Sequence, residues 1–149
     1  MTQDEKLEVL RRSPLFEMLS EAELRVLAEL SRARTFAAGE VVFGEGDAGD
    51  ALFVLAKGEV EVLANGAGAD PLALLSAPDA FGEMSLIDRE VRSATVRART
   101  ACTALQLGAE NFTAFRKRSR DGFTLFLVNV ARVLSSRLRE ANRRLAGRT

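Results

Sequence analysis

The most informative pattern in the chain is Phe81-Gly82-Glu83-Met84-Ser85-Leu86-Ile87-Asp88-Arg89-Glu90-Val91-Arg92-Ser93-Ala94-Thr95-Val96. It opens with a glycine, Gly82, which permits a sharp turn or a close approach of the backbone to a ligand. A carboxylate follows at Glu83, and a guanidinium follows nine positions later at Arg92. Apolar residues surround Glu83 and Arg92 in this segment, so we take it as the first candidate for a binding site.

The chemistry of this segment favours a phosphate and a sugar. If 83–87 forms one short helical turn, its free backbone amides make an anion site, and Arg92 can close on that anion with its planar charged fork. Glu83 is then free to accept hydrogen bonds from hydroxyl groups, which together predicts a nucleotide site. The alternative is a structural ion pair between Glu83 and Arg92. Exposed pairs contribute little and buried pairs often fail to offset desolvation, so that alternative leaves the surrounding Gly, Ser and Thr unexplained.

The segment resembles the phosphate-binding cassette of cyclic nucleotide-binding domains. That family reads roughly F-G-E-[LI]-A-L, a variable loop, then P-R-[AST]-A-[TS]-V, and this chain reads FGEMSL and VRSATV. Val91 stands where proline is common in the family. This departure loosens the loop, because φ is no longer fixed there, but it removes no ligand contact.

Short segments of β character, separated by glycines, follow one another between residues 34 and 107. Such spacing favours an antiparallel β-barrel or jelly roll. A second family motif supports this, because 39–42, 46–50 and 52–62 match it in order, which extends the resemblance to about 13–140. The glycines and Asp50 of that motif are expected to be structural. The expected strands are Thr35-Phe36, Glu40–Phe43, Ala51–Leu55, Gly58–Leu63, Leu72–Leu75, Ala94–Ala98 and Ala101–Leu107, and Ala64–Pro71 is an expected hairpin loop.

Helices are expected at both ends of the chain. Ser20 and Glu23 form a capping-box pattern that predicts a helix over 21–32, and another helix should start at Ala109. Asp121-Gly122 can cap the last helix. The predicted organisation is one domain over 1–149, with helices in 1–33, a β-roll in 34–107 holding a cassette at 81–95, and C-terminal helices in 109–147. The fold class is mainly β with added helices (α+β).

The last helix carries an apolar stripe and many arginines. We expect the distal half of the stripe to meet a second copy and form a homodimer; the alternative is packing only on the chain's own barrel. The arginines are expected to be a solvated face near the C-terminal end of the helix dipole, rather than a DNA-binding surface. The stripe is Phe123, Leu127, Val130, Leu134, Leu138, Ala141 and Leu145, and the arginines are Arg132, Arg137, Arg139, Arg143, Arg144 and Arg148.

Composition narrows the class of protein. The formal net charge is zero, which steers the molecule toward neither nucleic acid nor anionic membranes. With no histidine and one cysteine, Cys102, which we expect to be a buried apolar residue, we find no nucleophile–base pair and no metal ligand set. Residues 1–12 are too charged for a signal peptide, and no apolar run is long enough to span a membrane. A cytoplasmic protein that is not an enzyme is expected.

The resemblance implies the roles of individual residues. Arg92 would pair with the exocyclic oxygens of a cyclic phosphate, and Glu83 would accept from the ribose 2′-hydroxyl. The ligand implied first is cAMP, but Ser93 stands where alanine is associated with cAMP and threonine with cGMP, so cGMP stays open. No cofactor beyond this ligand is expected. The other expected contacts are Gly82, Met84, Ser85, Ser93, Ala94 and Thr95 around the phosphate, and Val60, Val62, Leu75, Ser136, Arg137 or Arg139 around the base.

Three hypotheses for the function remain open. The first is a cyclic nucleotide receptor that signals through population shift of its C-terminal helix, with Gly122 as a hinge, to an unknown effector protein. The second is a degenerate scaffold that kept the barrel and lost the ligand. The third is a DNA-binding regulator. Bacterial transcription factors of this family continue into a helix-turn-helix, and here only 146–149 follow Leu145, so we expect a stand-alone receptor or a fragment of a longer chain without direct DNA binding.

Overall fold

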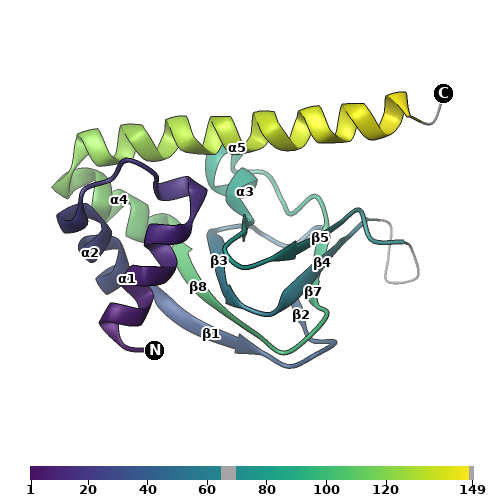
Figure 1. Ribbon diagram of the computed structural model, residues 1–149, viewed down its shortest axis with the longest axis horizontal. Helices are drawn as coiled ribbons and strands as arrows, with labels where there is room; N and C mark the ends of the chain where they lie inside the picture. Colours follow the sequence, from purple (N-terminus) through teal and green to yellow (C-terminus); the bar gives the residue numbers. More distant parts are fainter. Residues whose placement is uncertain (65–69, 148–149) are drawn as a thin grey trace.

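Two four-stranded antiparallel sheets form a jelly-roll-like β-sandwich (Figure 1). The computed structural model describes residues 1–64 and 70–147, so the centre of the expected hairpin loop at 64–71, and Arg148 of the expected arginine set, lie outside the described residues. The predicted fold class is confirmed, and the expected strands agree with the observed ones to within three residues at each end. The first sheet has the order β1 (Arg32–Phe36), β8 (Cys102–Gly108), β3 (Ala51–Lys57) and β6 (Ala80–Phe81), and the second has the order β2 (Val41–Phe43), β7 (Thr95–Ala98), β4 (Glu59–Leu63) and β5 (Ala73–Ser76).

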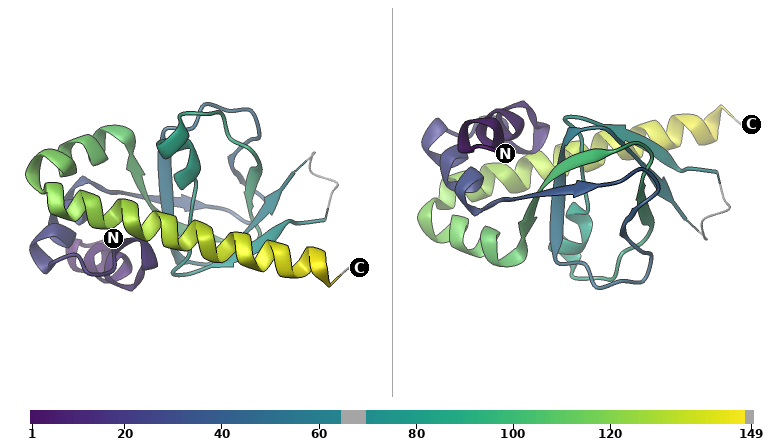
Figure 2. Two further views of the ribbon diagram at one scale, coloured as in Figure 1. Left: turned by 90° about the horizontal axis from the view of Figure 1, so that it is seen from above. Right: turned by 90° about the horizontal axis from the view of Figure 1, so that it is seen from below.

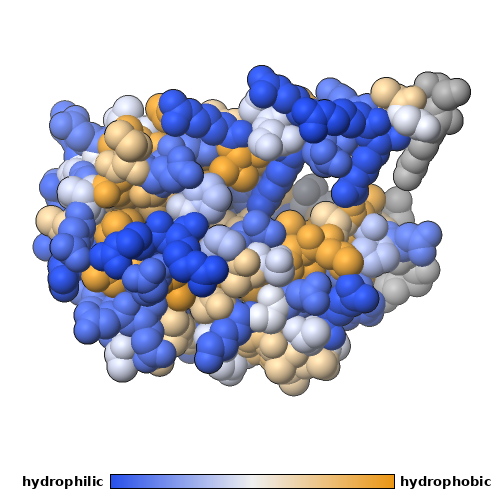
Figure 3. Space-filling view, viewed as in Figure 1, coloured by the Kyte–Doolittle hydropathy of each residue, from blue (hydrophilic) through white to orange (hydrophobic). Residues whose placement is uncertain are grey.

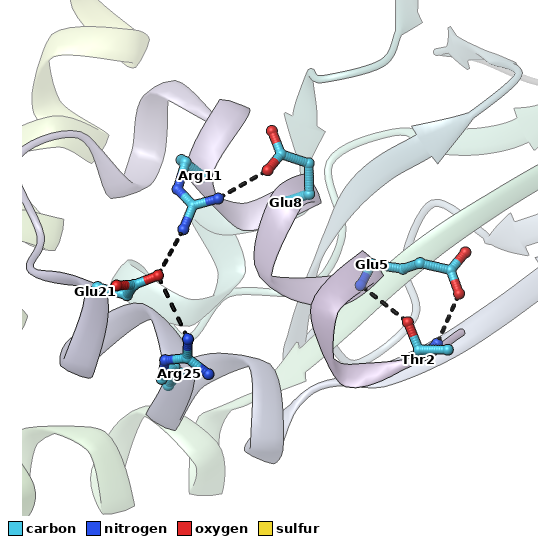
Figure 4. Close-up of polar contacts among 6 residues, drawn as sticks. All are labelled: Thr2, Glu5, Glu8, Arg11, Glu21 and Arg25. Atoms are coloured by element: carbon cyan, nitrogen blue, oxygen red, sulfur yellow. Dashed lines mark hydrogen bonds and ion pairs between the residues drawn. The ribbon is translucent and has the colours of Figure 1, made fainter.

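Helices pack at one end of the sandwich. They are α1 (Gln3–Arg12), the 3₁₀ turn η1 (Pro14–Phe16), α2 (Glu21–Leu30), α4 (Ala109–Arg118) and the first turns of α5 (Arg120–Ala146). The predicted capping box of α2 is present, since Ser20 and Glu23 each accept from the other's backbone N–H. Thr2 and Glu5 cap α1 in the same way. The ion pair of Arg11 with Glu21 joins α1 to α2, and Arg25 pairs with the same carboxylate within α2 (Figure 4).

Strand β3 is buried on both faces and separates two apolar cores. Leu52 and Val54 point into a core shared with the helices, whereas Phe53 and Leu55 point into the core between the two sheets. A strand covered on both sides reads as a continuous apolar run, which is why 51–55 shows no alternation in sequence. Cys102 belongs to the inter-sheet core and is 4% exposed, as expected. Burial raises the pKa of its thiol, which keeps it in the unreactive protonated form.

The long helix α5 crosses the whole molecule, from the helical end to a position over β4 and β5 (Figure 2). Its N-cap is Ser119, whose hydroxyl accepts from the backbone N–H of Gly122 at 3.0 Å. The expected cap at Asp121-Gly122 is therefore wrong by two residues. Ser119 competes better for this role because its extended backbone (φ −152°, ψ 99°) leaves the hydroxyl free to reach the first-turn amides.

The buried face of α5 differs from the predicted stripe. Phe126, Asn129 and Val130 are buried against the helical end, but Leu127, Leu138 and Leu145 are 39%, 62% and 60% exposed. The predicted stripe combined residues from two neighbouring faces of the helix. Steps of three and four average 3.5 residues per turn, whereas a straight α-helix has 3.6 residues per turn, so a stripe chosen in this way drifts from one face to the next. The exposed residues belong to one heptad-like series, which we call the α5 seam: Leu127, Ala131, Leu134, Leu138, Ala141 and Leu145.

The surface of α5 turned toward the viewer in Figure 3 is largely hydrophilic, in line with the expected solvated arginine face. Arg132, Arg139 and Arg143 are all exposed. Within the described part of the chain, no helix is both long and apolar enough to cross a membrane.

Candidate functional site

The predicted helical turn exists and is positioned by Gly82. Helix α3 (Glu83–Asp88) begins after Gly82, whose φ of +86° lies in the left-handed region that favours glycine. A Cβ at this position would lie 2.9 Å from Arg92 Nη1 and 3.0 Å from the carbonyl oxygen of Ala51. Gly82 is thus required both for the turn into α3 and for the close approach of Arg92.

Arg92 is buried beneath this turn and is 5% exposed. Its Nη1 donates to the carbonyl of Gly82 at 2.8 Å, and its Nη2 donates to the carbonyl of Ala51 at 2.7 Å. The Phe43 ring covers one face of the guanidinium, whose Cζ lies 4.0 Å from the ring centroid. Arg92 Nε has no hydrogen-bond partner among the described residues, although it is shielded from solvent.

The burial of Arg92 has an electrostatic cost. Desolvation lowers the pKa of its guanidinium, since burial disfavours the charged form. The negative charges of Asp50, Glu83 and Asp47 oppose this effect, in decreasing order. An arginine remains charged under these conditions. The site therefore holds a desolvated cation whose Nε–H no group among residues 1–64 and 70–147 satisfies.

Glu83 is 3% exposed and is paired with α5 rather than with Arg92. Arg137 Nη1 lies 2.9 Å from Glu83 Oε1, and Arg137 Nη2 donates to the carbonyl of Ala80 at 2.6 Å. The alternative of a structural Glu83–Arg92 ion pair is not what the structure contains. Glu83 and Arg92 instead have separate partners, and Arg137 joins the cassette to the long helix.

A cavity of about 130 Å³ lies between these groups. It brings together most of the expected ligand contacts, from the cassette, from β4 and β5, and from α5. Of the sequence-predicted residues, those that line it are Gly82, Glu83, Met84, Ser85, Arg92, Ser93, Ala94, Val62, Leu75 and Arg137.

Four predicted contacts lie elsewhere. Val60, predicted as a base contact, is 0% exposed in the inter-sheet core and does not line the cavity, whereas Val62, two positions along the same face, does. Thr95 is not in the lining, and its hydroxyl accepts from the backbone N–H of Glu45 at 2.9 Å. Ser136 lines a separate cavity beside η1. Arg139, on the exposed face of α5, is not in the lining either.

The lining also includes Phe43, Phe81 and Val96. Phe81 and Val96 are the two ends of the sequence segment that predicted the site, but no pattern in the sequence marked Phe43 as a site residue. It reads as one more apolar strand residue, and only the packing of β2 beside the cassette brings its ring over Arg92. A site formed by two segments far apart in sequence is invisible to a pattern within either one.

Ser85 links this cavity to a larger one of about 480 Å³ on the other side of α3, because it lines both. The β2–β3 loop packs tightly here. A Cβ at Gly49 would lie 2.2 Å from Ser85 Cβ and 3.0 Å from Arg92 Nε. Gly49 was expected to be structural, and the structure gives the reason, since only glycine permits the loop to close on the cassette.

Comparisons with known proteins agree with this geometry. The family model described as cyclic nucleotide-binding domain matches residues 33–119. The protein named cyclic AMP receptor protein from Thermus thermophilus is 36% identical over 132 residues, which is 87% of this chain and 59% of that protein. A protein named glutaminase 1 from Bradyrhizobium diazoefficiens is 39% identical over 134 residues, covering 89% of this chain and 21% of that protein. The chain thus spans only part of the length of both relatives.

Solved structures support the same assignment. A crystal structure of a cyclic nucleotide-binding domain from Methylobacillus flagellatus superposes with a TM-score of 0.86 at 26% identity, covering 99% of this chain and 84% of that one. The catabolite activator protein of Thermus thermophilus superposes with a TM-score of 0.75 at 35% identity, covering 89% of this chain and 62% of that one. The chain therefore belongs to the cyclic nucleotide-binding domain family.

Proposed function

We propose that this chain is a receptor module for a cyclic nucleotide, with cAMP as the ligand and cGMP as the alternative. The observation that carries the proposal is the state of Arg92, a buried cation whose Nε–H has no acceptor among the described residues. Leaving a buried charged donor unpaired costs about 1–3 kcal/mol or more. An anionic ligand that accepts from this edge removes that cost, which gives the site an affinity for phosphate.

The proposed pose follows from the cavity. The exocyclic phosphate oxygens accept from Arg92 Nε and from the first-turn amides of α3, while the ribose 2′-hydroxyl donates to Glu83. Because Glu83 has two carboxylate oxygens and Arg137 uses only Oε1, one oxygen remains for the sugar. The purine lies against the apolar side chains of Val62 and Leu75.

Arg137 supplies the coupling between ligand and helix. The cavity of about 130 Å³ is smaller than the roughly 300 Å³ of typical small-molecule sites, and Arg137 spans it from α5 to Glu83. Entry of a nucleotide requires Arg137 and its segment of α5 to shift. The ligand therefore favours the arrangement of α5 in which the cavity is open enough to hold it, and a partner protein or domain responds to that shift.

The α5 seam indicates where a second subunit could contact this helix. Leu138 and Leu145 are each about 60% exposed within one chain, and the seam repeats every three and four residues. Such a series buries itself well against a second helix of the same kind. We propose a homodimer through the α5 seam, so that a shift of α5 in one subunit is felt by the other.

Other features of the proposal rest on the sequence. Residues 1–149 act as one regulatory domain without catalytic activity, in the cytoplasm, and without direct DNA binding. The effector that responds to α5 is unidentified, and it is either a separate protein or a further segment of a longer chain.

The experiment is calorimetric titration of the full chain with cAMP and with cGMP. Tight binding of either, lost in Arg92→Leu and weakened in Arg92→Lys, is the expected result. Arg97→Leu is the matched control, because Arg97 lies on β7, pairs with Glu61 at 2.6 Å, and does not line the cavity. Circular dichroism checks that each variant is folded. No heat and no thermal shift with either nucleotide would contradict the proposal and favour a degenerate scaffold, since a ligand at 100 times its Kd adds about 2.7 kcal/mol of stability.

A further inference from the structure

We infer that Phe43 is a positioning residue that prepares Arg92 for the phosphate by holding the guanidinium face against its aromatic ring. This inference rests on the proposed function, because it assigns a role within that same site. Phe43 comes from β2, about fifty residues before Arg92 in the sequence, and lies outside the cassette. Its ring centroid is 4.0 Å from Arg92 Cζ, which is well inside the range for a cation–π contact.

The guanidinium is constrained by hydrogen bonds, by an aromatic ring and by close backbone contacts. Nη1 and Nη2 are anchored in the plane by the carbonyls of Gly82 and Ala51. Gly82 and Gly49 approach its edges so closely that a Cβ on either would lie within 3.0 Å of a guanidinium nitrogen. Phe43 covers one face. Within the described part of the chain, Nε is the buried guanidinium nitrogen without an acceptor, so the surrounding groups leave this donor for the ligand.

The ring also reduces the cost of keeping this cation buried before a ligand arrives. Desolvation of Arg92 is only partly opposed by carboxylates, and no carboxylate hydrogen-bonds to it in the described residues. The negative face of an aromatic ring attracts a cation without offering a hydrogen-bond acceptor. Phe43 thus stabilises the charge without occupying the Nε–H that the phosphate needs. A carboxylate at the same place would stabilise the charge but would compete with the ligand.

Phe43 itself is held by neighbouring rings. Its centroid lies 6.1 Å from that of Phe53 and 6.0 Å from that of Phe81, and those two rings stack at 5.3 Å. Such ring contacts fix the orientation of a side chain beyond what its buried area supplies. The cluster connects the inter-sheet core to the phosphate site, so a rigid core orients Phe43 and Phe43 orients Arg92.

The test replaces Phe43 in the full chain with phenylalanines that carry one, two and three ring fluorines, which weaken the negative ring face at nearly constant shape. The expected result is a stepwise fall in cAMP affinity, ending about 5- to 30-fold below the unmodified chain. Phe43→Leu should lose a similar amount, and Phe43→Trp or Phe43→Tyr should restore binding. A purely structural role predicts no dependence on fluorination at unchanged melting temperature, and that result would overturn the inference.

The same fluorine series at Phe53 is the control, because Phe53 belongs to the ring cluster but has no arginine over its face. Its series should leave the affinity unchanged.

A second readout needs no nucleotide. It is the NMR signal of Arg92 Nε–H, which is assigned by its loss in Arg92→Lys. We expect a ring-current shift that disappears in Phe43→Leu and persists throughout the fluorine series at Phe53, which leaves the shape of that ring nearly constant. If the chain binds neither nucleotide, the proposed function fails, while this signal still decides whether Phe43 positions Arg92; an unshifted signal would overturn the inference.

Discussion

Arg137 Nη1 lies 2.9 Å from Glu83 Oε1, so the only cation paired with the cassette carboxylate in the described residues comes from α5, 54 positions along the chain. The carboxylate is almost fully buried, whereas the arginine is about one third exposed. This contact ties the cassette to the long helix α5, which runs along the whole molecule (Figure 1). In the proposed mechanism, the strength of this contact determines how firmly a change at the ligand reaches α5.

Replacing Arg137 with alanine should uncouple α5 from the ligand without abolishing binding. We expect the free energy of unfolding to fall by about 2 kcal/mol, because Glu83 loses a charge-assisted hydrogen bond. Nucleotide should still bind, because Arg92 and its cage are intact. In the unmodified chain, amide hydrogen exchange over 133–145 should change on adding cAMP, and in Arg137→Ala this change should be absent.

Arg132→Ala is the matched control for this prediction. Arg132 lies on the same helix, is exposed, and lines a different cavity. Its replacement should alter neither stability nor the exchange response by a measurable amount. An unchanged exchange response in Arg137→Ala would mean that the ligand reaches α5 by another route.

Gly49→Ala should damage the site although Gly49 contacts no ligand in the proposed pose. The new Cβ would lie 2.2 Å from Ser85 Cβ, so the β2–β3 loop and α3 must separate. Overpacking of this kind costs about 1–3 kcal/mol, and the displaced Arg92 should bind nucleotide at least tenfold more weakly. Thermal melting and titration measure the two effects. Gly147→Ala is the control, because its φ of −68° suits alanine and a Cβ there meets nothing nearer than 3.4 Å.

The cassette was predictable from sequence because its chemistry is local. Gly82, Glu83 and Arg92 lie within eleven positions, and each needs a specific residue type for a turn, a hydroxyl or a phosphate. Phe43 and the Glu83–Arg137 pair were not predictable in the same way. Both depend on the packing of distant elements, and an apolar strand residue or one arginine among several on a helix gives no sign of what it will contact.

The helices show the same division. The N-terminal cap of α2 could be predicted because a capping box is completed within four residues. The buried face of α5 was not, because steps of three and four fit two adjacent faces, and the choice between Val130 and Leu127 is made by η1 and α4 rather than by α5 itself. Sequence periodicity detected the helix and its apolar character, and tertiary contacts selected the face.

Glu23 should make stability depend on pH in the acid range. The hydroxyl of Ser119 donates a hydrogen bond to Glu23 Oε2, and this bond, with the hydrogen bonds to Ser20, holds the pKa of the carboxyl below its ordinary value of 4.5. A lowered folded-state pKa means that the ionised form stabilises the fold. This contribution is fully present above 4.5 and is lost as the pH falls through the folded-state pKa.

Glu23→Gln is the corresponding variant, and it should be less stable than the unmodified chain at neutral pH. The difference in the free energy of unfolding, about 1 kcal/mol for such a partly exposed bond, should shrink as the pH is lowered from 6 to 3. Glu29→Gln on the exposed side of the same helix should show no such trend. A difference that stays constant with pH would show that Glu23 acts by packing near Gly122 rather than by its charge.

Leu138→Glu should break the proposed dimer while leaving the fold of each chain intact. Leu138 is 62% exposed in the single chain, so a glutamate there costs the isolated subunit little. In a symmetric pair the seam buries this residue twice, and losing about 1.5–3 kcal/mol per leucine should weaken dimerisation by at least 100-fold. Sedimentation over a range of protein concentrations measures this directly. Arg139→Glu, one residue further and on the exposed arginine face, is expected to leave the dimer unchanged. If the unmodified chain sediments as a monomer at all concentrations, the seam must be covered by a different partner, and coupling between two nucleotide sites cannot run through α5.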